Sequence, residues 1–428
     1  MPVSDRNLVN DQLSQLRALL AALRTNPFYA GKLTGTGLLE GMASLAEFSA
    51  RCPFTTKADL VADQLAHPPF GTNLTYPLER YTRCHQTSGS TGNPLRWLDT
   101  PESWAWMLDN WETVHRQAGT TAADRIFFAF SFGPFLGFWT AFESAQRLGC
   151  MVLAGGGMNS VARLRAILDL RATMLCCTPT YAIHLAEIAA KEGIDLRGSQ
   201  VRTLSVAGEP GGSIPATRAR LQELWPGARV YDHHGMTEVG PVSYECPVRP
   251  GVLHIIERGF IAEIVSPVSG QPVSPGERGE LVLTNLGRLG SPLLRYRTGD
   301  WVQAAHSSPA PAGCACGSPD LALEGGILDR VDDMVVVRGV NVYPGAIEEI
   351  IRRVGGVAEY QVRVGQRQAL AELTVIIEPA AEMQAGADLA QRLARAFETG
   401  LALRVPVVVV AIGSLPRFEM KSRRWVRE

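Results

Sequence analysis

Short apolar runs alternate with amphipathic stretches through the middle of the chain, from about residue 125 to residue 235. RIFFAFSF (125–132) and TMLCCT (173–178) are apolar enough for buried strands, whereas SVARLRAILDLRA (160–172) repeats its hydrophobic residues at helical spacing. Three further runs complete the strand series: MVLAGGG (151–157), VRTLSVAGEP (201–210) and ARVYDHHG (228–235). Strands that alternate with helices of these lengths predict a mostly parallel sheet covered on both faces.

The pattern differs on either side of this region. Residues 8–50 read as helices, and from about residue 252 strands with Pro/Gly turns predict an antiparallel or barrel-like unit ending in the turn-rich loop 307–319. After Arg330, strand and helix patterns predict a small α+β domain whose last strand is VPVVVVAIGSL (405–415). We therefore expect an α/β domain over residues 1–330, with a β-rich part at about 240–325, and a second domain over 331–428.

Composition narrows the function classes. The chain has 428 residues, which is too long for one compact core, and its 46% hydrophobic and 19% charged residues are typical of globular proteins. A net charge of -1 gives no indication of a nucleic-acid or membrane surface. The N-terminus lacks a secretory signal pattern, and the run Val405–Ile412 is too short to span a bilayer, so a cytoplasmic protein is expected.

The stretch HQTSGSTGNP (85–94) concentrates hydroxyl and glycine residues between less polar segments. Its backbone N–H groups and hydroxyls suit phosphate oxygens, although the lysine of a Walker A loop is missing. A solvated Ser/Gly turn is the alternative interpretation.

Two other motifs follow predicted strands. HHGMTEVGP (233–241) offers Thr237 for a phosphate oxygen and Glu238 for Mg²⁺, at the place where ligands of open α/β sheets collect. His233 and His234 could form a metal pair, but adjacent side chains seldom point the same way, so stacking on a base is at least as good an interpretation. Thr298-Gly299-Asp300 is expected to end a strand, with the carboxylate on a ribose or merely capping a turn.

The order of these motifs resembles that of a known family. Two further motifs come after them. DRVDDMVVVRG (329–339) lies where the pattern of predicted strands and helices changes, and LPRFEMKSRRW (415–425) places Lys421 near the C-terminus. The series resembles the adenylate-forming (acyl-CoA synthetase) superfamily, and RGVNVYP after R-x-D-D resembles its phenylacetate-CoA ligase branch. The likeness runs from about residue 50 to the C-terminus.

The resemblance implies a role for each matching residue. The β- and γ-phosphates of ATP would be held by Ser88, Gly89, Ser90, Thr91 and Gly92. The adenine would lie along Gly208, Glu209 and Pro210, with Asp232 near its amino group and His234 where the family usually stacks a Tyr. Thr237 would contact the α-phosphate, Asp300 the ribose, and Arg330 the ribose or a phosphate. Glu238 would bind Mg²⁺, Asp332 would be the hinge between the domains, and Lys421 would bridge the carboxylate and the α-phosphate.

The implied reaction joins a carboxylate to ATP and passes the acyl group to coenzyme A. Negative charge builds up as the carboxylate attacks phosphorus, so Mg²⁺ and the Lys421 ammonium must converge there, and the small domain must close and later rotate. The sequence departs from the family pattern at His234, at Asp329, where Gly is usual, and at Met420, where Gly is common. None of these changes removes a charged group that the reaction requires.

The substrate is expected to be an aromatic acid related to phenylacetate, benzoate or anthranilate. Its pocket would include Phe132, Gly133, Phe135, Ala207 and Gly235, although core packing explains most of the Phe residues in AFSFGPFLGFW (129–139) equally well. Transfer to a carrier-protein thiol is the alternative reaction, and a non-catalytic nucleotide-binding relative is a third hypothesis. A homodimer is left open.

Three of the eight cysteines and one histidine remain as candidates for a metal site outside these motifs: Cys246, Cys314, Cys316 and His254. Three Cys and one His satisfy a closed structural zinc site, but C-x-C is an unusual ligand spacing. Free thiols are the alternative, because a large chain without a secretion signal does not need disulfides.

Overall fold

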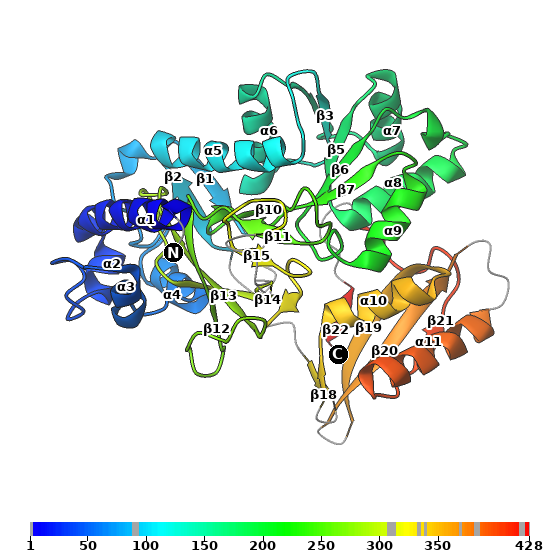
Figure 1. Ribbon diagram of the computed structural model, residues 1–428. Coiled ribbons are helices and arrows are strands. Elements are labelled where there is room, and N and C mark those ends of the chain that lie inside the picture. Colours follow the sequence, from blue (N-terminus) through cyan, green and yellow to red (C-terminus); the bar gives the residue numbers. More distant parts are fainter. Residues whose placement is uncertain are drawn as a thin grey trace.

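A computed structural model describes residues 3–87, 94–305, 314–331, 335–337, 340–367, 370–380, 386–418 and 424–427 (Figure 1). The helices are α1 (Val3–Ala22), α2 (Pro27–Lys32), α3 (Leu45–Arg51), α4 (Lys57–Ala66), α5 (Pro101–Gln117), α6 (Leu136–Arg147), α7 (Ser160–Asp169), α8 (Pro179–Lys191), α9 (Pro215–Leu224), α10 (Pro344–Val354) and α11 (Gly386–Leu401), with short 3₁₀ turns at Leu23–Thr25, Leu78–Arg80 and Leu196–Gly198. The strands before residue 260 are β1 (Arg83–Gln86), β2 (Arg96–Asp99), β3 (Arg125–Phe128), β4 (Met151–Ala154), β5 (Met174–Cys177), β6 (Thr203–Val206), β7 (Arg229–Asp232), β8 (Gly235–Met236), β9 (Gly240–Pro241), β10 (Ser243–Glu245) and β11 (Leu253–Ile255). The later strands are β12 (Phe260–Val265), β13 (Arg278–Asn285), β14 (Tyr296–Gln303), β15 (Ala322–Leu323), β16 (Asp329–Arg330), β17 (Val335–Val337), β18 (Val340–Val342), β19 (Val357–Arg367), β20 (Leu370–Pro379), β21 (Val407–Val409) and β22 (Trp425–Arg427).

The predicted parallel sheet is confirmed. Its strand order is β4-β3-β5-β6-β7, and every neighbouring pair is parallel. Successive side chains enter different cores, since Ile126 and Phe128 pack in one hydrophobic cluster and Phe127 packs in another. A strand needs apolar residues at every position only when both of its faces are covered, which explains the unbroken hydrophobic runs.

The strands of this sheet are shorter than their apolar runs. β3 ends at Phe128, and the chain then turns sharply at Phe132 and Gly133, which have φ values of 62° and 54°. The Pro134 carbonyl accepts a hydrogen bond from Gln86 N–H at 2.9 Å, so the turn lies beside the end of β1. Hydrophobicity marks burial, and these residues stay buried or half-buried after the strand pairing has ended.

The β-rich region consists of two antiparallel sheets, β12-β13-β14-β16 and β10-β11-β15, linked by a bridge between Ala304 and Leu323. The expectation that Thr298-Gly299-Asp300 ends a strand is wrong, because these residues lie inside β14. They form a bulge where the pairing with β13 shifts, with Gly299 at φ 76°. Thr298 Oγ1 donates to Leu281 O at 2.8 Å and accepts from Asp300 N at 3.0 Å, which fixes the bulge.

The C-terminal region has a core of its own, built by α10 and α11 against the sheet β21-β20-β19-β22. The predicted last strand at 405–415 is wrong in two respects. Only Val407–Val409 pairs there, and β22 follows it and pairs in parallel with β19. A three-residue strand such as Trp425–Arg427 has too few positions for a recognisable alternation, so only its partner strand reveals it.

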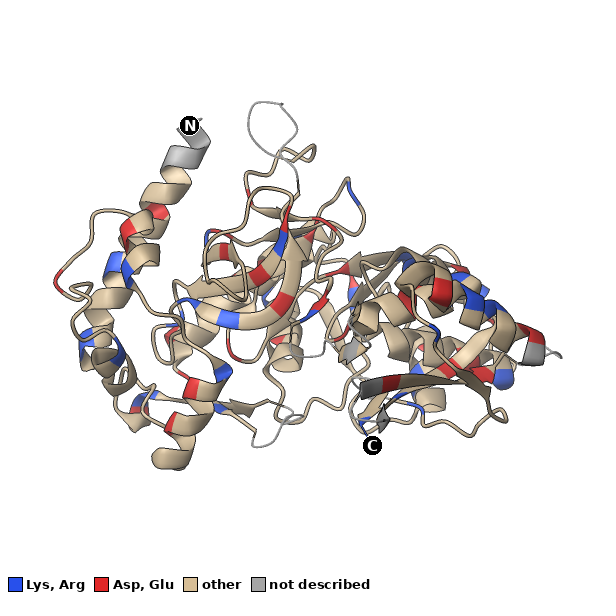
Figure 2. Ribbon diagram, turned by 90° about the horizontal axis from the view of Figure 1, so that it is seen from below, with Lys and Arg blue, Asp and Glu red and all other residues tan. Residues whose placement is uncertain are grey.

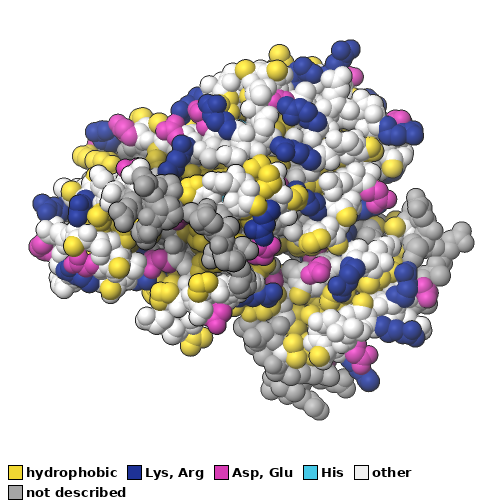
Figure 3. Space-filling model, viewed as in Figure 1, with side chains coloured by type: hydrophobic (Ala, Val, Ile, Leu, Met, Phe, Trp, Pro, Cys, Tyr) yellow, Lys and Arg dark blue, Asp and Glu magenta, His cyan; other side chains and the backbone are white. Residues whose placement is uncertain are grey.

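The C-terminal region lies against α8 and α9, at the opposite end of the molecule from α1 (Figures 1 and 2). Arg424 Nη1 contacts Thr180 Oγ1 of α8 at 3.3 Å, and Arg417 Nε lies 4.0 Å from Glu187 Oε2. On the face shown in Figure 3, basic side chains lie near acidic ones over both the large region and the C-terminal region, in keeping with the net charge of -1. Among the described helices, none is long and apolar enough to cross a bilayer.

A fully buried ion pair joins distant parts of the large region. Arg288 Nε and Nη2 each lie 2.7 Å from an oxygen of Asp99, at the end of β2, and both side chains have no exposed area. Arg288 Nη1 also donates to the carbonyls of Thr237 at 2.7 Å and Glu238 at 3.0 Å. One guanidinium therefore fixes the β1–β2 hairpin relative to the segment after β8.

Arg288→Met should destabilise the protein by about 3–5 kcal/mol, because Asp99 would keep its charge in a buried site without a partner. Urea unfolding followed by tryptophan fluorescence measures the effect. Arg80→Met is the matched control, since the Arg80–Glu102 pair is exposed and should contribute less than about 1 kcal/mol. Equal effects of the two substitutions would contradict the anchoring role of Arg288.

Candidate active site

Three ionisable side chains meet at the bulge in β14. His234 Nε2 lies 2.9 Å from Asp300 Oδ2, and Arg330 Nη1 lies 3.1 Å from Asp300 Oδ1. Burial by itself would raise the pKa of Asp300, but the neighbouring His234 and Arg330 outweigh it and hold that pKa below its ordinary value. The carboxylate therefore stays ionised in a buried position, as an acceptor for two hydroxyls must.

The sequence predicted this meeting only in part. Asp300 was expected at the ribose and Arg330 at the ribose or a phosphate, and the structure pairs the two residues in register across β14 and β16. His234 was expected to stack on adenine, which stays a prediction, and the structure adds that its Nε2 lies next to Asp300 Oδ2. The ring of His233 packs edge-on against Trp111 at 4.6 Å, so the two histidines diverge and do not form a metal pair.

Asp232 lies at the end of β7 in a closed hydrogen-bond network. Its Oδ2 accepts from Ser213 Oγ at 2.6 Å, and its Oδ1 accepts from His233 N–H at 2.9 Å. Burial raises the pKa of Asp232 to about 7, against the lowering effect of the Ser213 hydrogen bond. A side chain on Gly212 would come within 2.5 Å of this carboxyl group, so glycine is required for the close approach.

Glu245 of β10 supports the same segment from behind. Its Oε2 accepts from Asp232 N–H at 3.0 Å, its Oε1 accepts from Gly251 N–H at 2.7 Å, and Arg218 neutralises it at 2.7 Å. Ser243, two residues earlier on β10, accepts from His234 N–H at 3.0 Å. β10 therefore holds the backbone of residues 232–234 in place.

Glu238 is a buried carboxylate with a cation nearby. Only 6% of the residue is exposed, and Lys57 Nζ, at the start of α4, lies 3.7 Å from Glu238 Oε1. Tyr296, four residues before Asp300, is buried and hydrogen bonded to Glu238. Thr237 is half-buried, and Arg288 holds its carbonyl, as described above.

Glu238 suits a magnesium ion. Mg²⁺ prefers one or two carboxylates and otherwise takes water and phosphate oxygens, so a single carboxylate beside a nucleotide is enough.

The segment Gly208–Pro210 follows β6 at the same edge of the sheet. The Glu209 carboxylate accepts a hydrogen bond from Thr180 N–H at 2.8 Å, so this side chain fixes the segment to α8. Arg424 contacts the Thr180 hydroxyl at 3.3 Å, so Thr180 links this segment to the C-terminal region. Ser88, Gly89, Ser90, Thr91, Gly92, Asp332 and Lys421 lie outside the described residues.

The predicted substrate residues have different environments. Phe132 is only 8% exposed and packs on Trp139 and Phe142 with ring centroids 5.0 and 5.4 Å apart. Phe135 and Ala207 are half-buried, and Gly133 and Gly235 are exposed. Phe132 thus has the packing of a core residue, while its φ of 62° holds the strained turn after β3 in shape.

Four supporting residues carried no signal in the sequence: Lys57, Asp99, Glu245 and Arg288. Each acts through a partner far along the chain, and no motif spacing links the 189 residues between Asp99 and Arg288. The charge of these four residues was a weak signal at most. Buried charged residues are rare and therefore informative, but the sequence does not show which charged residues are buried.

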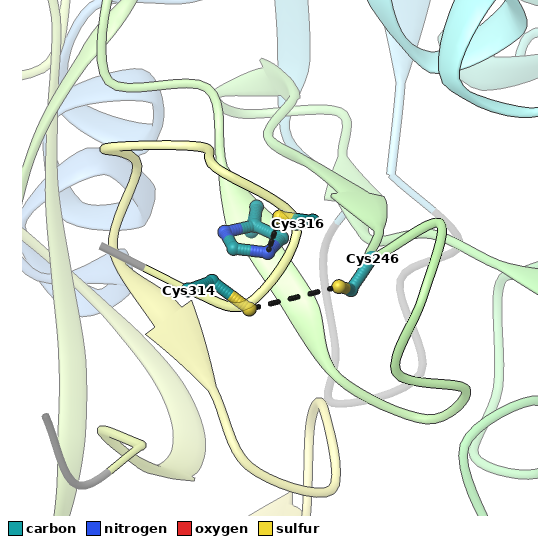
Figure 4. Close-up of side chains that lie close together, drawn as sticks. Cys246, Cys314 and Cys316 are labelled. Carbon is teal, nitrogen blue, oxygen red and sulfur yellow. Dashed lines mark hydrogen bonds between the residues drawn. The ribbon is translucent and has the colours of Figure 1, made fainter. Parts of the chain in front are cut away.

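The four predicted zinc ligands converge in the β-rich region, apart from the groups described above. One ligand atom from each of Cys246, His254, Cys314 and Cys316 lies within 4.8 Å of the others. The thiols of Cys246, directly after β10, and of Cys314 point toward each other, and the thiol of Cys316, in the same turn before β15 as Cys314, faces the His254 imidazole (Figure 4). The structure thus brings together residues that are up to 70 positions apart in the sequence.

Comparisons with known proteins match both the large region and the C-terminal region of this chain. A family model described as "AMP-binding enzyme" matches residues 86–287, and one described as "AMP-binding enzyme C-terminal domain" matches residues 339–428. A phenylacetate-coenzyme A ligase of Pseudomonas putida is 30% identical over 425 residues, which are 96% of this chain and 92% of that protein.

The solved structures add the relation between the two regions. The crystal structure of a 2-hydroxyisobutyryl-CoA ligase in the postadenylation state, in complex with R3-HIB-AMP, is 28% identical, covers 100% of this chain and 90% of that chain, and has a TM-score of 0.91. A structure of that ligase with 2-HIB-AMP and CoA in the thioesterification state is 29% identical, covers 100% and 91%, and has a TM-score of 0.72. The arrangement seen in this chain therefore matches the postadenylation state better.

The match in sequence along nearly the whole chain, the two family models in their expected order and the shared fold lead to one assignment. The chain belongs to the phenylacetate-CoA ligase-like branch of the adenylate-forming superfamily, and it is an AMP-forming acid–CoA ligase.

Proposed function

We propose that this ligase activates an aromatic carboxylic acid of the phenylacetate, benzoate or anthranilate type with ATP, and that it transfers the acyl group to coenzyme A. The products are an aryl-CoA, AMP and pyrophosphate. The observation that carries the proposal is the pair of buried carboxylates, Asp300 and Glu238. Burial raises the pKa of the Tyr296 phenol, and the charges of both carboxylates raise it further. One carboxylate can accept hydrogen bonds from hydroxyl groups and the other can hold a metal ion. Binding of a nucleoside triphosphate requires both, for its ribose and for the cation on its phosphates.

In this proposal Asp300 and Arg330 bind the ribose, and His234 orients Asp300 through the 2.9 Å contact. The adenine lies along Gly208–Pro210 with its amino group near Asp232, and Thr237 binds the α-phosphate. The loop with Ser88, Gly89, Ser90, Thr91 and Gly92 binds the β- and γ-phosphates.

Glu238 would hold Mg²⁺, which neutralises phosphate charge when it is bound. Lys57 lies 3.7 Å from Glu238 Oε1 and offsets the charge of this buried carboxylate. Lys421 supplies the second cation and bridges the substrate carboxylate and the α-phosphate. Two cations on different sides of the phosphorus atom lower the cost of bringing a carboxylate to an anionic nucleotide.

The two domains, at residues 1–330 and 331–428, are proposed to alternate about a hinge at Asp332. Arg417 and Arg424, described residues on either side of Lys421, both contact α8 in the large region. Through Thr180, Arg424 is connected to Glu209 in the proposed adenine segment. These contacts, and the similarity to a postadenylation state, support a closed position for the first half-reaction.

The aromatic class of the acid rests on the phenylacetate-CoA ligases at 30% identity. The aromatic turn after β3 supports this choice, since Phe135 is half-buried and adjoins the exposed Gly133. The 2-hydroxyisobutyryl-CoA ligase is 28% identical and gives a small hydroxy acid as the competing class. Coenzyme A is the acceptor, and a carrier-protein thiol is the alternative acceptor.

The Cys/His cluster does not take part in this reaction. Its four ligands form a closed set, which leaves no position for a substrate on an ion bound there.

ATP–pyrophosphate exchange should be stimulated by at least one aromatic acid in a panel of phenylacetate, benzoates, anthranilate and heteroaromatic acids. Because the proposal assigns an aromatic pocket, 2-hydroxyisobutyrate should stimulate exchange far less. With the best acid, coenzyme A should yield an acyl-CoA and AMP, and a phosphopantetheinylated carrier protein should not. The proposal for the acid fails when 2-hydroxyisobutyrate alone supports exchange.

Lys421→Ala should lower the rate of adenylation by about 10²–10³-fold, because a cation at the reaction centre is lost. Thioester formation from preformed acyl-adenylate should change far less. Single-turnover assays of each half-reaction separate the two rates. Lys191→Ala, an exposed lysine at the end of α8, is the control and should leave both rates unchanged. Equal losses in both half-reactions would contradict the role of Lys421.

Glu238→Gln should weaken the dependence of adenylation on Mg²⁺, because the amide has a similar shape but no charge for the ion. We expect a rate about 10²-fold lower at ordinary Mg²⁺ concentrations, with partial recovery when Mg²⁺ is raised. Mg²⁺ titrations of the exchange rate measure this shift. Glu223→Gln on the surface of α9 is the matched control, and an unchanged Mg²⁺ midpoint in Glu238→Gln would remove the assignment.

A further inference from the structure

We propose that Cys246, His254, Cys314 and Cys316 bind one zinc ion as a closed structural site. Three of these ligands are sulfur atoms and one is an imidazole nitrogen, and all four ligand atoms lie within 4.8 Å of one another. Soft thiolates combined with imidazole in a four-ligand set favour zinc among the common cellular metals.

The distances between the ligand atoms fit a tetrahedral zinc ion. With Zn–S bonds of about 2.3 Å, two sulfur atoms of a tetrahedron lie about 3.8 Å apart, and with Zn–N of about 2.0–2.1 Å a sulfur and a nitrogen lie about 3.6 Å apart. Cys246 Sγ lies 3.7 Å from Cys314 Sγ, and Cys316 Sγ lies 3.4 Å from His254 Nε2. Both pairs thus have the separation that a shared ion requires.

A disulfide does not explain these distances. A bonded pair of sulfur atoms is about 2.05 Å apart, which is far shorter than the separation of Cys246 and Cys314. A disulfide would also leave the third thiol and the imidazole without a reason to converge. The other cysteines show the contrast, because Cys52, Cys84, Cys150, Cys176 and Cys177 belong to no such group of described residues.

The surroundings orient the imidazole as metal sites do. His254 Nδ1 lies 3.0 Å from the carbonyl oxygen of Asp320, so Nδ1 carries the proton and Nε2 presents its lone pair to the thiols. Tyr244 stacks on the His254 ring at 5.3 Å, and its hydroxyl donates to Asp320 Oδ2 at 2.7 Å. The ring that faces the cluster is therefore fixed on two sides.

A cation lies next to the thiols, although it also pairs with Glu324. Three thiolates and one Zn²⁺ ion leave one negative charge, and Arg249 Nη1 lies 3.9 Å from Cys314 Sγ. Cys314 and Cys316 sit in a tight turn in which Gly317 N–H donates to Cys314 O at 2.8 Å. The short C-x-C spacing is thus accommodated by a turn with Gly317 at φ 82°.

The position of the site gives it a structural role. Cys246 directly follows β10, whose Glu245 and Ser243 hold the backbone of Asp232 and His234 in the active site. His254 lies in β11, and the turn with Cys314 and Cys316 leads to β15, the third strand of the same sheet. One ion would therefore clamp all three segments of the sheet that supports the nucleotide site.

Metal analysis of the full-length ligase tests the proposal. Protein purified without chelators under reducing conditions should contain about one zinc per chain by plasma mass spectrometry. Cys314→Ser and Cys316→Ser should each lose most of this zinc, and the matched control Cys84→Ser, an exposed thiol outside the cluster, should retain it. Wild-type protein that lacks zinc even after reconstitution with ZnCl₂, or equal zinc in all variants, would overturn the site.

A second measurement covers variants that fail to fold. Cobalt-substituted wild-type ligase should show the intense visible bands of tetrahedral Co²⁺ with thiolate ligands, and removal of the metal should lower the thermal midpoint. Cadmium substitution should leave ATP–pyrophosphate exchange unchanged, because a closed site supplies shape and no chemistry. Octahedral cobalt spectra would contradict the ligand set, and metal content is measured without substrate, so it does not depend on which acid the ligase activates.

Discussion

The geometry of the active site depends on one buried ion pair, between Arg288 and Asp99. The guanidinium gives two hydrogen bonds to the carboxylate and two more to the carbonyls of Thr237 and Glu238. It thereby fixes the end of the β1–β2 hairpin, the segment after β8 and the turn after β13 as one unit. A buried pair that uses both charge and directional hydrogen bonds specifies a geometry that apolar packing alone leaves loose.

Several buried carboxylates surround this unit, and each has a different role. Asp300 remains ionised because His234 and Arg330 flank it, whereas burial raises the pKa of Asp232 to about 7. Glu245 is neutralised by Arg218 and uses its oxygens on backbone N–H groups. Carboxylates of the same chemical type are thus divided between ligand binding and support by their neighbours.

The β-rich region connects the two metal sites that we propose. β10 holds the backbone of Asp232 and His234 through Glu245 and Ser243 and is followed directly by Cys246, so one short strand adjoins both proposed sites. A sheet of three short strands has few backbone hydrogen bonds with which to resist distortion. A metal clamp is a physically reasonable addition at such a place, since metal binding contributes directly to the stability of the folded state.

The sequence by itself determined the alternation of buried strands and amphipathic helices, the change in the pattern of predicted elements near residue 330, and the order of motifs that identifies the family. These features depend on local periodicity and on residue type, which can be read without knowing any distant contact. Even the set Cys246, His254, Cys314 and Cys316 could be named, because cysteine and histidine are few and chemically distinctive.

Only the tertiary structure decided which polar groups meet. It placed Thr298–Asp300 in a bulge inside β14, turned His234 onto Asp300 and Glu209 onto Thr180, and added β22 to the C-terminal sheet. It also brought Arg288 to Asp99 across 189 residues. Such contacts arise when the packing of whole elements brings their ends together, and the spacing of residues along the chain carries no record of that packing.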